Sequence, residues 1–194
     1  MRVERPVGPP GPEPITPEDA AHYRRVDDLL AEDRNVFELA IRAAREYAER
    51  RTGRALVDRE WELVLDQFPC GRQPIEITRV PVDITSIEIR YVDADGAEQT
   101  LDPSAYVVVD GEPVRIAPVD DWPATPCDRI GAVVVKFQAG PGAVGVPDIL
   151  RSAMLLHIGD LHEHREDTIA GGTVTPRRVV DMIYDEYAVG RRYA

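Results

Sequence analysis

The sequence predicts an α+β fold, in which N- and C-terminal helices pack as a helical domain around an inserted antiparallel β region of about six short strands. Apolar residues recur with helical spacing towards both ends of the chain, whereas in the middle they alternate with polar residues. The connections between the alternating runs are too short for crossover helices, which favours antiparallel pairing of neighbouring strands.

The N-terminal quarter of the chain divides into an arm and two helices. Residues 1–15 hold five of the 17 prolines and two glycines without periodicity, which predicts a flexible proline-rich arm outside the core. Residues 16–56 should contain a short helix that begins after Thr16, followed by a helix over 31–52 that Gly53 ends. Two apolar stripes give the longer helix a wide apolar face: Val36, Ala40, Ala43 and Tyr47, beside Phe37, Ile41, Ala44 and Ala48.

Residues 57–139 form the predicted β region. Turn signals such as Asp93-Ala94-Asp95-Gly96 and Asp110-Gly111 separate its alternating runs. The apolar residues that mark the strands are Trp61, Leu63 and Leu65; Ile75 and Ile77; Ile87, Ile89 and Tyr91; Val107 and Val109; Val114 and Ile116; and Val133, Val135 and Phe137.

The chain returns to helical spacing after Gly140. Apolar residues surround most of the circumference of a helix within 146–165, so we expect that helix to be buried on nearly all sides. Residues 166–175 are predicted to form a flexible loop, and 176–194 an amphipathic helix and tail. Residues 16–194 would then fold as one structural unit, and removal of 176–194 should leave it folded.

Composition excludes several classes of function. The net charge of −12 argues against a protein that wraps DNA or docks on anionic lipid, because both need a basic surface. No apolar run reaches the roughly 20 residues of a membrane span, and residues 1–14 do not look like a signal peptide, so we expect the protein in the cytoplasm. Cys70 and Cys127 are expected to be free, buried thiols.

The histidines near the end of the chain are the main candidates for a chemical site. His157, Asp160 and His164 share one helical face and could ligate a metal, which makes a cytoplasmic metal- or ligand-binding domain the alternative hypothesis. The same face carries Ile149, Ala153 and Leu161, so a packed interface is the simpler interpretation. No nucleophile elbow, phosphate-binding loop or convergent carboxylate pair is evident, and we therefore predict neither an enzyme nor a cofactor.

An ordered series of segments resembles the head–tail connector proteins of long-tailed phages and gene transfer agents, also called head-completion or adaptor proteins. The resemblance covers about Thr16 to Arg165, and the last helix weakly. Leu161-His162 departs from it, because family members often carry aromatic residues there. The segments that carry the resemblance are AAREYAERRTGRAL, REWELVLDQFP, ITSIEIRYVDADGAEQTLDPSAYVVV, WPA, AVVVKFQAGPG and VPDILRSAMLLHIGDLHEHRED.

The resemblance implies a structural virion protein. Such a subunit assembles in the host cytoplasm into a ring, dodecameric in this family, beneath the portal protein of a phage or gene transfer agent particle. The ring extends the channel through which DNA passes without specific binding, and it docks the neck, stopper or tail protein. A tail-side stopper or terminator is the alternative within this class. The resemblance brings no catalytic residues.

The loop and the last helix are the expected contacts with a neighbouring subunit. The wide apolar helical faces exceed what one small core needs, and head-to-tail contacts between such faces can close into a ring. The candidate interface residues are Glu166, Asp167, Thr168, Ile169, Val179, Val180, Ile183, Tyr184 and Tyr187.

Overall fold

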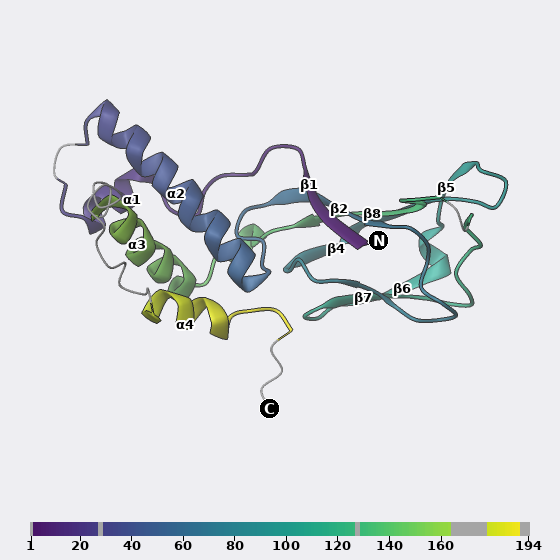
Figure 1. Cartoon of the computed structure of the whole chain (residues 1–194). Coiled ribbons are helices and arrows are strands. Elements are labelled where there is room, and N and C mark those ends of the chain that lie inside the picture. The colour runs from purple at the N-terminus through teal and green to yellow at the C-terminus, as the bar shows by residue number, and fades with distance from the viewer. Residues whose placement is uncertain (1, 27–28, 127–128, 164–177, 191–194) are drawn as a thin grey trace, which may run out of the picture. The chain divides into compact units, whose positions relative to one another are not determined.

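A computed structural model describes residues 2–26, 29–126, 129–163 and 178–190, and it divides the chain into two compact units (Figure 1). The β unit comprises Met1–Gly11 and Val57–Gly140, and the helical unit comprises Pro12–Leu56 and Pro141–Ala194. Each unit is thus built from two separate stretches of chain. Four helices and two antiparallel sheets in the described residues confirm the predicted α+β class.

The β unit holds two sheets. A five-stranded sheet has the order β1-β2-β8-β4-β5, a three-stranded sheet has the order β3-β7-β6, and every pairing is antiparallel. The strands are β1 (Arg2–Val7), β2 (Arg59–Leu65), β3 (Ile75–Ile77), β4 (Val82–Val92), β5 (Glu98–Thr100), β6 (Tyr106–Val109), β7 (Val114–Pro118) and β8 (Val133–Ala139).

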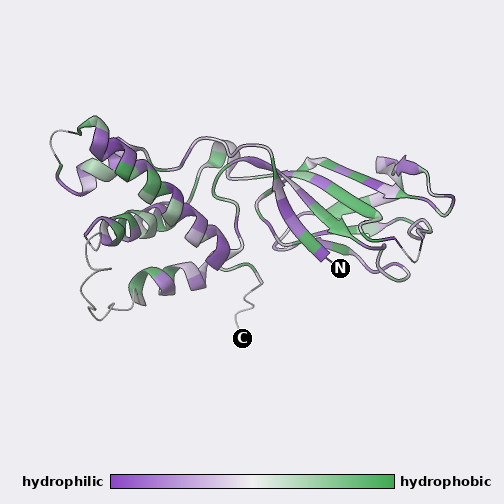
Figure 2. Cartoon of the chain, turned by 45° about the horizontal axis from the view of Figure 1, so that its top comes forward, coloured by the Kyte–Doolittle hydropathy of each residue, from purple (hydrophilic) through white to green (hydrophobic). Residues whose placement is uncertain are grey.

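Alternate residues of the two sheets supply the core of the β unit. Leu63, Ile89 and Val135 on the large sheet are fully buried, and so are Ile77 and Ile116 on the small one. The Tyr106 hydroxyl donates to the Ile87 carbonyl oxygen (3.2 Å) and joins the sheets. Figure 2 shows hydrophobic residues concentrated on the central strands of this unit. The alternation in the sequence therefore identified six of the eight described strands and missed β1 and β5.

The first residues of the chain differ from the expected flexible arm, because Arg2–Val7 forms β1 at the edge of the large sheet. Its register places Arg2 opposite Leu65 and Val7 opposite Glu60. Pro6 is tolerated because an edge strand can lack a backbone donor on one side. The proline content of this segment led to the prediction of an arm, and only Val3 and Val7 in its sequence favour a strand.

The helical unit contains α1 (Pro17–Tyr23), α2 (Ala31–Thr52), α3 (Asp148–Glu163) and α4 (Arg178–Glu186). Thr16 and Asp19 form a capping box at α1, with the Asp19 backbone N–H donating to Thr16 Oγ1 (3.0 Å) and the Thr16 N–H to Asp19 Oδ2 (3.1 Å). Gly53 ends α2 in the left-handed conformation, as its place in the sequence predicted. No helix in the described part of the chain is long and apolar enough to cross a bilayer.

One hydrophobic core joins all four helices. It includes Ala20 and Ala21 of α1, the Phe37 stripe of α2, Met154 and its neighbours on α3, and Tyr184 of α4. The second stripe of α2 is only partly used, since Ala40 and Tyr47 pack against this core while Ala43 is exposed.

Burial of α3 is one-sided, which corrects the prediction of a helix buried almost all round. Leu150, Ala153, Met154, His157 and Ile158 face the core. On the opposite side Ile149 and Leu156 are 43% and 38% exposed, with Ser152 between them. The apolar circumference of the sequence therefore provides a core face and an additional exposed apolar face.

Gly140, at the end of β8, is the backbone position where the β unit tolerates least change. Its φ is +156°, and a Cβ built there would lie 2.2 Å from Asp58 Oδ1 and 2.4 Å from Asp58 Cα. Its N–H donates to the Pro81 carbonyl oxygen (3.0 Å), and this hydrogen bond opposes any shift of the backbone away from Asp58. Gly96, in the β4–β5 turn, shares a positive φ of +86° but has no atom within 4 Å of that Cβ position.

We expect Gly140→Ala to lower the free energy of unfolding of the β unit by about 3 kcal/mol, from overpacking and backbone strain together. Gly96→Ala, which adds backbone strain alone, should cost about 1 kcal/mol. Urea unfolding followed by tryptophan fluorescence measures both, because the only two tryptophans, Trp61 and Trp122, lie in this unit. Equal losses from the two variants would contradict the close approach of Asp58.

Candidate interaction surfaces

A buried arginine on α2 binds the segment before α1 and, through Glu49, the segment after α2. The Arg45 side chain on α2 is 5% exposed; its Nε donates to Glu13 Oε2 (2.9 Å) and its Nη1 to Glu49 Oε2 (2.8 Å). Burial alone would lower the pKa of Arg45, but the charges of Glu49 and Glu13 outweigh it and raise that pKa. The other Glu49 oxygen accepts the Leu56 backbone N–H (2.9 Å). These contacts hold residue 13 and residue 56 to the same turn of α2.

Polar contacts also dock α4 along the C-terminal half of α2. The Tyr47 hydroxyl donates to Asp181 Oδ1 (2.8 Å), and the Arg51 guanidinium binds both carboxylate oxygens of Asp185 (2.5 and 2.9 Å). Beyond the helix, the Val189 N–H donates to the Thr52 carbonyl oxygen (2.7 Å). The acids of α4 thus face bases and hydroxyls of α2, so α4 is an integral part of the unit.

Large apolar side chains are exposed on three helices of this unit. Leu39 on α2 is 64% exposed, Val179 and Met182 on α4 are 63% and 70% exposed, and Ile149 and Leu156 are the exposed residues of α3. Single exposed apolar residues are common on proteins, but a pair on each of two neighbouring helices is typical of a contact surface. We call Val179 and Met182 the outer face of α4.

The structure divides the predicted interface residues into inner and outer ones. Val180 and Tyr184 are buried at 4% and 0% exposure, and Ile183 and Tyr187 pack against the same core, whereas Val179 faces outward. Met182 was missed, although it lies three residues after Val179 on one helical face. The loop candidates Glu166, Asp167, Thr168 and Ile169 lie outside the described residues.

The predicted histidine site is built differently from a metal centre. His157 is 2% exposed and packs edge-on against the Tyr47 ring, with centroids 4.9 Å apart. Asp160 is partly exposed, and His164 lies outside the described residues. Nowhere in the described ranges do three His, Cys, Asp or Glu side chains gather as they would around a metal ion. His157 therefore acts in the packing of α2 against α3.

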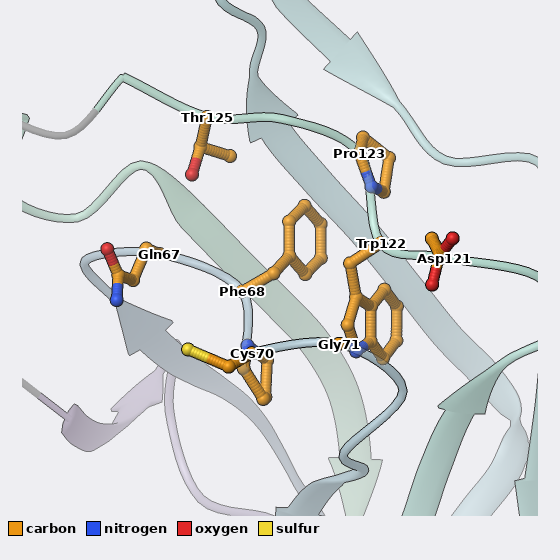
Figure 3. Close-up of a pocket in the computed structure, with 9 residues that line it drawn as sticks. Gln67, Phe68, Cys70, Gly71, Asp121, Trp122, Pro123 and Thr125 are labelled. Carbon is orange, nitrogen blue, oxygen red and sulfur yellow. The ribbon is translucent and has the colours of Figure 1, made fainter.

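A hollow of about 360 Å³ in the β unit is lined by two loops (Figure 3). The Phe68 and Trp122 rings stack at 4.8 Å, and the indole N–H of Trp122 donates to the Gln73 carbonyl oxygen (2.9 Å). Cys70 at its rim is exposed, which corrects the expectation of a buried thiol; Cys127 lies outside the described residues. The aromatic stack therefore holds the two loops together.

Because Val180 and Tyr184 are buried in the core of the helical unit, we now expect the last helix to be needed for folding. We predict that Tyr184→Ala lowers the free energy of unfolding of the helical unit by about 3 kcal/mol, since it empties a fully buried site. Met182→Ala, two residues away and 70% exposed, should change it by less than about 0.5 kcal/mol. Thermal unfolding followed by far-UV circular dichroism measures both, and a stable Tyr184→Ala protein would refute this role of α4.

Arg45 should be equally critical, for an electrostatic reason. Arg45→Ala leaves the carboxylates of Glu13 and Glu49 facing each other with little exposure, and we expect a loss of about 2–3 kcal/mol. The matched control is Arg42→Ala on the same helix, where an exposed pair with Glu38 at 4.0 Å should contribute less than about 0.5 kcal/mol. The same unfolding measurement applies, and equal losses at the two positions would show that the buried cluster adds nothing.

Solved structures that match over nearly the whole chain include the following three. A chain in the neck of an empty gene transfer agent (GTA) particle, computed with C6 symmetry, superposes with a TM-score of 0.77 and is 26% identical. A chain in the virion of a native GTA particle gives 0.75 and 26%, and one in the neck of a native GTA particle, computed with C12 symmetry, gives 0.67 and 25%. Each match covers 98% of this chain and 97% of the other.

No protein-family model and no curated protein matches the sequence. The similarity therefore rests on structure, and it extends through both units and across the helices that carry the exposed apolar residues. These three similar chains are components of a GTA particle or of its neck.

Proposed function

We propose that this protein is a structural subunit of the neck of a gene transfer agent or phage particle, where it serves as a head–tail connector. The observation that carries the proposal is the match to neck chains over 98% of this chain and 97% of theirs. A match of this extent includes both the β unit and the helical unit. The ordered sequence segments that resemble connector proteins support the same role.

The connector is proposed to act as a ring of twelve subunits. The similar neck chains belong to assemblies computed with C6 and C12 symmetry, and both symmetries are compatible with that number. A cyclic ring requires head-to-tail contacts between two different surfaces of the same subunit. The outer face of α4 (Val179 and Met182) and the exposed residues Leu39, Ile149 and Leu156 offer such surfaces on the helical unit.

In the particle, the ring would lie beneath the portal protein, extend the DNA channel and dock a neck or tail protein. The net charge of −12 supports a channel component, because a net acidic surface repels phosphate and lets DNA pass without being retained. A tail-side stopper differs only in its layer within the neck, so localisation within the particle separates the two roles. The metal-binding alternative has no supporting group among the described residues.

Deletion of the gene in the producing cell tests the proposal. We expect DNA-filled heads without tails, and expression of the tagged wild-type protein should restore tailed particles with the tag at the head–tail junction. Electron microscopy of purified particles reads out both results. Tailed particles in the deletion strain, or absence of the protein from the particles, would overturn the proposed function.

The outer face of α4 is expected to be required for assembly but dispensable for folding. Complementation with the double variant Val179→Glu and Met182→Glu should reduce tailed particles at least about tenfold, because two buried charges in each contact oppose ring closure. The double variant Ile84→Glu and Ile130→Glu places the same charges on exposed positions of the β unit and is the control. Normal tailing by the α4 variant would exclude this face as a ring contact.

A further inference from the structure

The two sheets of the β unit have four edge strands, and three of them are protected against pairing with another chain. β1 carries Arg2, Arg5 and Pro6, and β5 is a three-residue strand of exposed polar side chains. β3 is covered from β1, since the Arg2 side chain donates to the Glu76 carbonyl oxygen. Charges, proline, short length and covering side chains are the usual means by which proteins prevent strand addition.

The remaining edge strand, β6, contains neither a charged residue nor a proline. Its sequence is Tyr-Val-Val-Val, and its register runs from Tyr106 opposite Pro118 to Val109 opposite Arg115. β7 is its only strand partner among the described residues. In an antiparallel pair, alternate residues direct their backbone N–H and C=O groups away from the partner, so β6 presents groups that another strand can bind.

The outer face of this edge is apolar as well. Val107 and Val109 are 53% and 57% exposed, and Val107 lies opposite Ala117 on β7. Val119, which donates its backbone N–H to the Ala105 carbonyl oxygen (2.9 Å), is 49% exposed and extends the same face. A strand added to β6 would therefore place every second side chain beside a row of valines.

Acidic residues lie at both ends of this row. Asp110 and Glu112 are exposed beyond the C-terminal end of β6. Asp102 and Asp120 are exposed near its N-terminal end, where Asp120 is 3.9 Å from Arg72 Nη2. Each end also has one arginine: Arg115, opposite Val109, has its Nε 3.8 Å from Glu76 Oε1, and Arg72 Nε is 3.8 Å from Asp121 Oδ1. The valine row is thus uncharged, and acids outnumber arginines at each end.

We propose that the β6 edge binds an extended segment of a different protein by β-strand addition. That segment has apolar side chains at alternate residues, which pack on Val107 and Val109, and a basic residue at each end, which meets the flanking acids. Backbone hydrogen bonds hold the segment, and the alternating side chains and terminal charges select it. This site lies in the β unit and is independent of the proposed ring contacts in the helical unit.

Charge excludes a second copy of this chain as the occupant. Antiparallel pairing of two β6 strands would bring Asp110 of one copy beside Asp102 and Asp120 of the other. Parallel pairing would bring Asp110 beside its own counterpart. Each arrangement places like charges together in a protein of net charge −12.

The experiment uses the full-length protein and a fluorescein-labelled peptide Lys-Val-Thr-Val-Thr-Val-Thr-Lys with blocked ends. Anisotropy should give saturable binding that weakens with added salt, and hydrogen exchange should show new amide protection at 106–109. The peptide N-methylated at alternate residues, which cannot form the ladder, should not bind. The same peptide with Glu at both ends should bind at least about tenfold more weakly.

Protein variants complete the test. Val107→Lys with Val109→Lys should weaken peptide binding at least about tenfold, because lysines on an edge strand oppose pairing. Val3→Lys, on the protected edge β1, should change binding less than about twofold. No binding, equal binding of the N-methylated peptide, protection away from β6, or self-association lost in the lysine variants would each overturn the proposal. The assay involves no particle, so its failure is distinct from failure of the proposed function.

Discussion

The buried Arg45 cluster is the constraint on which the helical unit depends. A guanidinium with 5% exposure is stable there only because Glu13 and Glu49 both contact it, and neither carboxylate would be placed so well without the cation. Glu13 precedes the first helix, and Glu49 also binds the Leu56 N–H, so the cluster fixes both points at which the N-terminal half of the unit is joined to the β unit. Arg42, on the same helix, is exposed and pairs only loosely with Glu38, at 4.0 Å.

The second constraint is that α4 has to serve two surfaces at once. Tyr184 and Val180 complete the core that α2 and α3 leave open, while Asp181 and Asp185 bind Tyr47 and Arg51 of α2. Only after these contacts fix the helix does its outer face of Val179 and Met182 acquire a defined direction. The core therefore positions the surface that the proposed ring uses, and damage to the core would remove that surface as well.

Sequence patterns predicted those parts of the fold whose signals are local. Gly53 marked the end of α2 because only a left-handed residue closes that helix, and the alternation around Leu63 and Val135 identified central strands. Strands that form only through long-range pairing were not predicted. β1 is a strand because it pairs with β2, and its prolines suggested a flexible arm instead. The pattern assigned candidate contacts to the last helix, but it could not separate Tyr184, which faces inward, from Val179, which is exposed. Which side of β6 is buried was equally undetermined, since consecutive valines fit either face.

The distribution of charge explains why so few surfaces are candidates for assembly. In a chain of net charge −12, copies and acidic neighbours repel each other across most of the exposed area. Contacts then form most readily where apolar side chains are exposed, as on the outer face of α4 and the valines of β6, or where the partner is basic. The β6 edge combines both conditions, because its valine row ends near Asp102 and Asp110. An apolar face on one unit suits contact between copies, whereas an apolar row flanked by acids suits a different, basic partner. The two proposed surfaces therefore differ in chemistry, and the proposed ring subunit would use one for its neighbours and the other for a different protein.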